Sequence, residues 1–135
     1  PTTCRRQRQM CIRDSHWRLL ESDVDLTTAL RTIPQQSSVL IDALGGFVAC
    51  HLDDSDLAWN DCCEALVEQL TGMGQTCVVV IEETGWGVVP PTRIGGRFRD
   101  RLGSLAQILD RQANSAWLVL QGRAVDLHAL SQRVP

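Results

Sequence analysis

Short apolar runs alternate along the chain with longer segments of helical period, starting at about residue 16. Three of these runs are rich in β-branched and other apolar residues, at residues 38–42, 77–81 and 116–120. A strand that is apolar on both faces is typical of a parallel sheet with helices on both sides. We therefore predict three strands at these positions.

The segments between the runs carry apolar residues three and four apart, which predicts helices. A short helix at residues 26–30 ends before Pro34, and a second begins after a cap at residue 53, 54 or 55 and ends at Gly72 or Gly74. A third, long helix contains glycines that permit a bend. Its predicted apolar face carries Ile94, Phe98, Leu102, Leu105 and Leu109.

This order of strands and helices predicts an α/β fold with parallel strand pairing and right-handed crossovers. In such sheets ligands bind beyond the carboxyl ends of the strands. The length of 135 residues suits one compact domain, which we place at residues 16–135.

Charge divides the chain unevenly. Residues 1–15 hold four arginines against one aspartate, a net charge of +3, so the other 120 residues carry −6 of the total of −3. An acidic body argues against nucleic acid as a partner, because that affinity rests on neutralising phosphates. No apolar run approaches the roughly 18 residues that a membrane helix needs, so no membrane segment is expected.

All 13 basic residues are arginines, and the chain has no lysine. Phosphate-binding loops of the G-x-x-x-x-G-K-[ST] type, Schiff-base enzymes and V-A-I-K kinases all require a lysine. Any contact with phosphate in this chain must therefore use arginine, backbone amides or a metal ion.

Six cysteines occur without a C-x-x-C pattern, and the three histidines are distant from them in spacing. We predict reduced thiols in a cytoplasmic protein and no structural zinc site. His51 is interpreted as a loop residue and His128 as a surface residue, and no Ser/His/Asp or Cys/His triad is visible.

Carboxylates follow two of the predicted strands. Asp42 ends the first, where nucleotide-binding α/β proteins place a magnesium ligand, although an aspartate also commonly begins a turn. Glu82 and Glu83 end the second, and alternation sends them to opposite faces. We favour Glu83 as the one that faces the site of Asp42, because the glycine-rich loop follows it directly; two solvated carboxylates remain the alternative.

Two further features allow more than one interpretation. Trp86, between Gly85 and Gly87, either stacks on a base or fills the edge of the sheet, and we favour the latter. Arg97, Arg99 and Arg101 either bind phosphate or form a solvated helix face.

Together these segments resemble the bifunctional adenosylcobinamide kinase/adenosylcobinamide-phosphate guanylyltransferase family of cobalamin synthesis over about residues 16–125. The glycine-rich loop, followed ten residues later by F-R-D and a glycine, is the specific part. The segments that carry the resemblance are His16-Trp17-Arg18 with Glu21, Val39-Leu40-Ile41-Asp42, Glu83-Thr84-Gly85-Trp86-Gly87-Val88-Val89-Pro90, and Arg97-Phe98-Arg99-Asp100 with Gly103.

The resemblance implies an enzyme that phosphorylates adenosylcobinamide and then transfers GMP from GTP to that phosphate through a guanylyl-histidine. It implies a P-loop NTPase-like, mostly parallel sheet flanked by helices, with ATP and GTP as substrates, Mg²⁺ as cofactor, and a homotrimer. By position, Glu21, Asp42 and Glu83 match nucleotide-binding residues of the family, with Asp42 as the metal ligand.

Several features depart from the family pattern. The family's first strand and glycine-rich lysine loop have no counterpart here, and its nucleophilic histidine aligns with Gln9. His16 aligns with a different position, so no catalytic residue is assigned. We interpret residues 1–15 as a non-native or disordered head, and we expect the chain to be an amino-terminally truncated, inactive and poorly soluble fragment. The alternatives are a non-catalytic nucleotide-binding or assembly subunit and a structural module.

Overall fold

The computed structural model describes residues 16–22, 25–87 and 91–133. Residues 1–15 lie outside this range, so the head stays a prediction, and so do residues 88–90 of the glycine-rich loop. The elements along the chain are α2 (Leu26–Arg31), β1 (Val39–Asp42), α3 (Leu44–Cys50), α4 (Asp56–Gly72), β2 (Cys77–Val80), α5 (Arg93–Gln112), β3 (Trp117–Leu120), β4 (Arg123–Asp126) and α6 (Leu127–Leu130).

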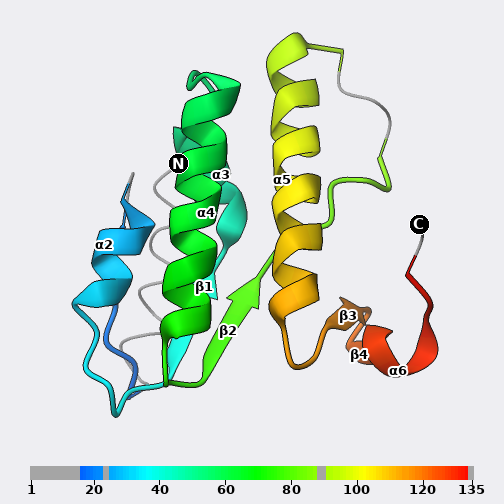
Figure 1. Cartoon of the computed structure of the whole chain (residues 1–135). Helices are drawn as coiled ribbons and strands as arrows, with labels where there is room; N and C mark the ends of the chain where they lie inside the picture. Colours follow the sequence, from blue (N-terminus) through cyan, green and yellow to red (C-terminus); the bar gives the residue numbers. More distant parts are fainter. Residues whose placement is uncertain (1–15, 23–24, 88–90, 134–135) are drawn as a thin grey trace.

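Strands β1 and β2 form a parallel pair, in which Val39 lies opposite Cys77 and Asp42 lies opposite Val80. The crossover between them contains α3 and the long helix α4, which stands beside α5 in Figure 1. The α/β class and the parallel pairing of the first two predicted strands are therefore confirmed.

The third predicted strand does not join this sheet. Within the described residues β3 pairs with β4 in a separate antiparallel hairpin, where Leu120 lies opposite Arg123. The two residues between the strands, Gln121 and Gly122, have φ angles of 50° and 73°, as a two-residue hairpin turn requires. Our parallel pairing for residues 116–120 was wrong because a glutamine in the first turn position gave no hairpin signal.

The core lies between one face of the parallel pair and helices α2 to α5. Its side chains come from every one of these elements and form one cluster. The buried apolar residues are Leu30, Val39, Ile41, Leu44, Phe47, Val48, Trp59, Cys63, Leu66, Leu102 and Leu105.

Helix α5 runs unbroken for 20 residues although it contains three glycines. Leu102 and Leu105 are fully buried, with Phe98 and Leu109 packed against the core, as predicted. Ile94 is wrong as a core residue because 54% of it is exposed. It lies in the first turn of the helix, beyond the core cluster.

The other face of the parallel pair is not covered as predicted. Leu40, Val78 and Val80 point away from the core and keep 44%, 52% and 40% of their surface exposed. The strands therefore alternate between buried and exposed side chains, and the prediction of helices on both faces is wrong for the described residues.

Side-chain caps define the starts of the two long helices. Ser55 accepts a hydrogen bond from the Ala58 amide at 3.2 Å, which selects it from the three predicted caps of α4. Thr92 accepts from the Gly95 amide at 3.1 Å and begins α5. Within the described ranges, none of the helices combines the length and apolar character needed to cross a membrane.

Candidate functional site: the carboxyl edge of the parallel strands

Asp42 is the last residue of β1, and its side chain is exposed at the carboxyl edge of the parallel pair. The peptide bond that joins it to Ala43 is cis, and α3 begins one residue later. This is the position at which open α/β sheets bind ligands. The structure therefore places Asp42 where the sequence predicted it.

Glu82 connects the end of β2 to the segment that follows Asp42. Its Oε2 accepts a hydrogen bond from the Gly45 amide at 2.9 Å. The approach is so close that a Cβ on residue 45 would lie 2.7 Å from the same oxygen, so glycine suits the contact. The carboxylate thereby fixes the first turn of α3 against the strand edge.

Glu83 makes a contact within the loop that follows β2. Its Oε1 accepts a hydrogen bond from the Gly85 amide at 2.6 Å, within its own loop. The structure thus gives the contact beside Asp42 to Glu82, which we had ranked below Glu83. The signal available in the sequence was Gly45, three residues after Asp42, which leaves room for a carboxylate.

Glu21 is exposed in the segment before α2. Across the described part of the chain, no hydrogen bond or ion pair joins it to Asp42 or Glu83. The three predicted nucleotide-binding residues are therefore not connected by direct contacts.

Trp86 is 66% exposed, so the interpretation that it fills the edge of the sheet is wrong. Trp86 belongs to the loop that follows Glu83, shortly after the carboxyl end of β2 in the sequence. A stacking surface for a planar ligand is the interpretation that remains open.

Two arginines of α5 hold the loop between α3 and α4 instead of forming a solvated face. Arg101 is only 6% exposed and donates to the carbonyl oxygens of His51 and, at 2.8 Å, Asp54. It also contacts Asp56 at 3.0 Å. Its guanidinium carbon lies 5.2 Å from the centre of the Trp59 ring.

Arg97 donates to the Leu52 carbonyl at 2.9 Å, in the same loop. Arg99 pairs with its neighbour Asp100 at 2.9 Å on the surface. Because Arg101 is buried against backbone carbonyls, it fits neither a phosphate site nor a solvated face.

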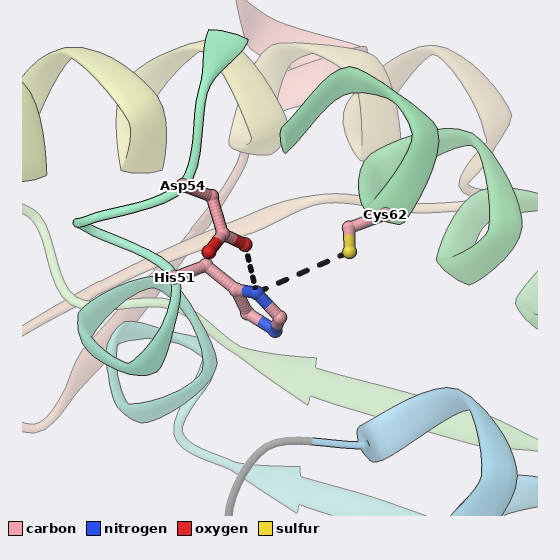
Figure 2. A group of neighbouring side chains, drawn as sticks. All are labelled: His51, Asp54 and Cys62. Atoms are coloured by element: carbon pink, nitrogen blue, oxygen red, sulfur yellow. Dashed lines mark hydrogen bonds and ion pairs between the residues drawn. The ribbon is translucent and has the colours of Figure 1, made fainter. Parts of the chain in front are cut away.

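His51 is not a simple loop residue. It caps the carboxyl end of α3, is 7% exposed, and has its Nδ1 2.7 Å from Asp54 Oδ2 and 3.9 Å from Cys62 Sγ (Figure 2). The chain brings together a histidine and a cysteine that are 11 residues apart, a spacing that we had treated as too long for a shared site. The four cysteines in the described ranges are free.

Comparison with known proteins decides the family. The profile of the family described as "Cobinamide kinase / cobinamide phosphate guanyltransferase" (CobU) matches residues 5–127. The chain belongs to this family. The resemblance inferred from the motifs is thereby confirmed, and the CobU match also includes residues 5–15, part of the segment that we set apart as a head.

Curated relatives agree with the CobU assignment. The bifunctional adenosylcobalamin biosynthesis protein CobU of Escherichia coli (strain K12) is 30% identical in an alignment 130 residues long that covers 85% of this chain and 72% of the relative. The protein of the same name from Salmonella typhimurium is 29% identical with the same coverage. The protein CobP of Pseudomonas aeruginosa, also a bifunctional adenosylcobalamin biosynthesis protein, is 29% identical over 117 residues, covering 85% of this chain and 68% of the relative.

Proposed function

We propose that this chain forms the nucleotide-binding body of an enzyme of cobalamin biosynthesis. The reactions are phosphorylation of adenosylcobinamide and transfer of GMP from GTP to the resulting phosphate. The match to the CobU family over residues 5–127 is the observation that carries this proposal. The exposed carboxylate at the carboxyl edge of a parallel strand pair supports it.

Within this proposal, Asp42 holds Mg²⁺ and Glu21 and Glu83 contact the nucleotide. Mg²⁺ usually takes one or two carboxylates and completes its shell with water and substrate phosphates. A single exposed carboxylate at the sheet edge fits that demand. Magnesium would neutralise phosphate charge at a site where this lysine-free chain offers no ammonium group.

Glu82 is a positioning residue in this arrangement. Its bond to the Gly45 amide holds the turn after Asp42 in place, because a carboxylate that accepts from a backbone amide forms a charge-assisted hydrogen bond. The exposed Trp86 is available to stack on a nucleobase.

The 135 residues alone do not complete either reaction in our proposal. Phosphoryl transfer depends on positioned cationic groups, and the chain has no lysine to serve as the family's phosphate-loop lysine. Gln9 aligns with the family's nucleophilic histidine, and the amide side chain of glutamine is not a comparable nucleophile. These two observations favour, as a second candidate, a non-catalytic nucleotide-binding or assembly subunit, which would act within a homotrimer.

A titration with GTP tests nucleotide binding. We expect GTP to bind the wild-type chain more tightly when Mg²⁺ is present. Asp42→Asn should reduce this Mg²⁺-dependent gain in affinity at least about tenfold, the effect of one charge-assisted contact. Asp53→Asn is the matched control, because Asp53 is an exposed aspartate outside β1, in the loop after α3. Equal Mg²⁺ dependence in wild type and Asp42→Asn would refute the role of Asp42.

A labelling experiment separates the two candidates. We expect GTP carrying label in its α-phosphate to leave no acid-labile covalent label on this chain. Covalent labelling would show that the guanylyl transfer step survives and would contradict the inactivity of the chain. Nucleotide binding without labelling is the outcome that the proposal expects.

A further inference from the structure

Three potential metal ligands converge at the junction between α3 and α4. Asp54 Oδ2 lies 2.7 Å from His51 Nδ1, and Cys62 Sγ lies 3.9 Å from the same nitrogen. The three ligand atoms all lie within 4.8 Å of one another. Figure 2 shows the carboxylate and the thiol directed at one side of the imidazole from two different elements.

The surrounding structure holds these groups in position. The buried Arg101 donates to the carbonyl oxygens of His51 and Asp54, so the backbone at two of the three residues is anchored by one guanidinium. The imidazole packs 4.7 Å from the Phe47 ring and 6.2 Å from the Trp59 ring, measured between centroids. Little conformational freedom therefore remains to be lost when a ligand binds.

The geometry does not suit a cysteine nucleophile. In a Cys–His–Asp triad the acid binds one ring nitrogen and the thiol the other, but here both approach Nδ1. The three side chains instead bring one ligand atom each close enough together to share a metal ion.

We propose that His51, Asp54 and Cys62 form a site for a zinc ion, with solvent as the fourth ligand. Imidazole, thiolate and carboxylate are the ligands that zinc takes in proteins. Asp54 and a deprotonated Cys62 would together balance the charge of a divalent ion. The Asp54 side chain is 36% exposed, which gives an ion access from solvent.

The rearrangement that binding requires is small. In a tetrahedral site, ligand bonds of about 2.1 Å to nitrogen and oxygen and 2.3 Å to sulfur put the nitrogen about 3.4 Å from the oxygen and about 3.6 Å from the sulfur. The present separations of 2.7 Å and 3.9 Å differ from these by less than about 1 Å. The thiol proton leaves to solvent as the sulfur–zinc bond forms, and the imidazole binds through its Nδ1 lone pair.

Cobalt(II), which reports its ligands optically, tests the proposal in the full chain. Cys4→Ser and Cys11→Ser are introduced throughout, because those thiols lie outside the described residues. We expect one equivalent of Co²⁺ to give the intense visible bands of a tetrahedral site together with a thiolate charge-transfer band. One equivalent of Zn²⁺ should remove both.

Two variants and one control assign the ligands. Cys62→Ala should abolish the thiolate band, and Asp54→Asn should weaken metal affinity at least ~100-fold, since even the loss of an outer contact costs 10–100-fold. Cys50→Ala, which removes an exposed thiol of α3 outside the group, should leave the spectrum unchanged. Far-ultraviolet circular dichroism confirms that each variant is folded.

Two results would overturn the proposal. The first is a wild-type spectrum that remains that of hydrated, octahedral cobalt. The second is a thiolate band that persists in the folded Cys62→Ala variant. Because neither readout involves nucleotide, the zinc site and the proposed function stand or fall separately.

Discussion

At the scale of single residues, Arg101 shows how far a buried contact can depart from what its residue type suggests. Its position in an arginine-rich segment favoured either phosphate or solvent, but its guanidinium lies inside the protein against two loop carbonyls. Which of three neighbouring arginines turns inward depends on the path of a loop some 50 residues earlier in the chain. Sequence periodicity holds no information on that path.

Replacement of Arg101 tests this role. Arg101→Met keeps the apolar stem but leaves the carbonyls of His51 and Asp54 without their donor, so we expect a loss of about 2–4 kcal/mol in unfolding free energy. Arg99→Met, two residues away on the surface, should change it by less than about 0.5 kcal/mol. Urea unfolding measures the free energy of both variants. Equal losses would contradict the role of Arg101 in holding the loop between α3 and α4.

A second residue-scale prediction concerns alkaline pH. Burial raises the pKa of the Cys63 thiol from 9.0 to about 11, so the folded state holds this proton more tightly than the unfolded state. The contribution of this thiol to the unfolding free energy should therefore be complete below pH 9. As the pH rises towards 11, the unfolding free energy should fall by up to about 2–3 kcal/mol. Because the chain has neither lysine nor tyrosine, thiols dominate titration in this range.

Urea unfolding at pH 8 and pH 10.5 provides the measurement. Cys63→Ala should flatten the decline, whereas Cys50→Ala should keep most of it, because Cys50 is exposed in the folded state. An unchanged slope in Cys63→Ala would rule out the buried thiol as its cause.

At the scale of elements, periodicity was a good guide wherever an element packs on the core. The extent of α4 and the buried positions Leu102 and Leu105 of α5 were predicted because burial imposes the helical spacing. Helix α3 and strand β4 were not predicted. The glycine pair at residues 45 and 46 obscured the helical pattern of α3. Strand β4 depends on a turn whose backbone conformation Gln121 does not indicate.

Two glycines should respond to alanine in opposite directions. Gly122 has a φ of 73°, so Gly122→Ala should destabilise the hairpin by about 1–2 kcal/mol. Gly103 lies inside α5 with open space where a Cβ would stand, so Gly103→Ala should stabilise the protein by about 0.5–1 kcal/mol. Thermal unfolding of both variants checks this, and shifts of the same sign would contradict the assigned turn and helix.

At the scale of the whole molecule, the sequence predicted the family and the carboxyl edge but not the final arrangement of strands. The position of Asp42 followed from local order alone, since a carboxylate after an apolar strand must lie at its carboxyl end. The choice between Glu82 and Glu83 depended on the path of the chain after Asp42, which only the assembled fold provides.

The exposed face of the parallel pair predicts self-association. Leu40, Val78 and Val80 form an apolar surface on strands whose side chains are half exposed, which favours aggregation. We expect light scattering from the wild-type chain to rise with concentration and the double variant Val78→Thr/Val80→Thr to reduce it. Leu57→Gln, on the first turn of α4, should not, and equal behaviour of the two variants would exclude this face as the cause.

We propose that nucleotide binds at the carboxyl edge of β1 and β2. Hydrogen exchange of the full chain, with and without GTP and Mg²⁺, tests it most directly because exchange reports where the backbone is protected. We predict protection in peptides that span residues 42–46 and 81–87, with the hairpin at residues 117–126 unchanged. Protection confined to the hairpin, or none at saturating GTP, would show that nucleotide does not bind at this edge.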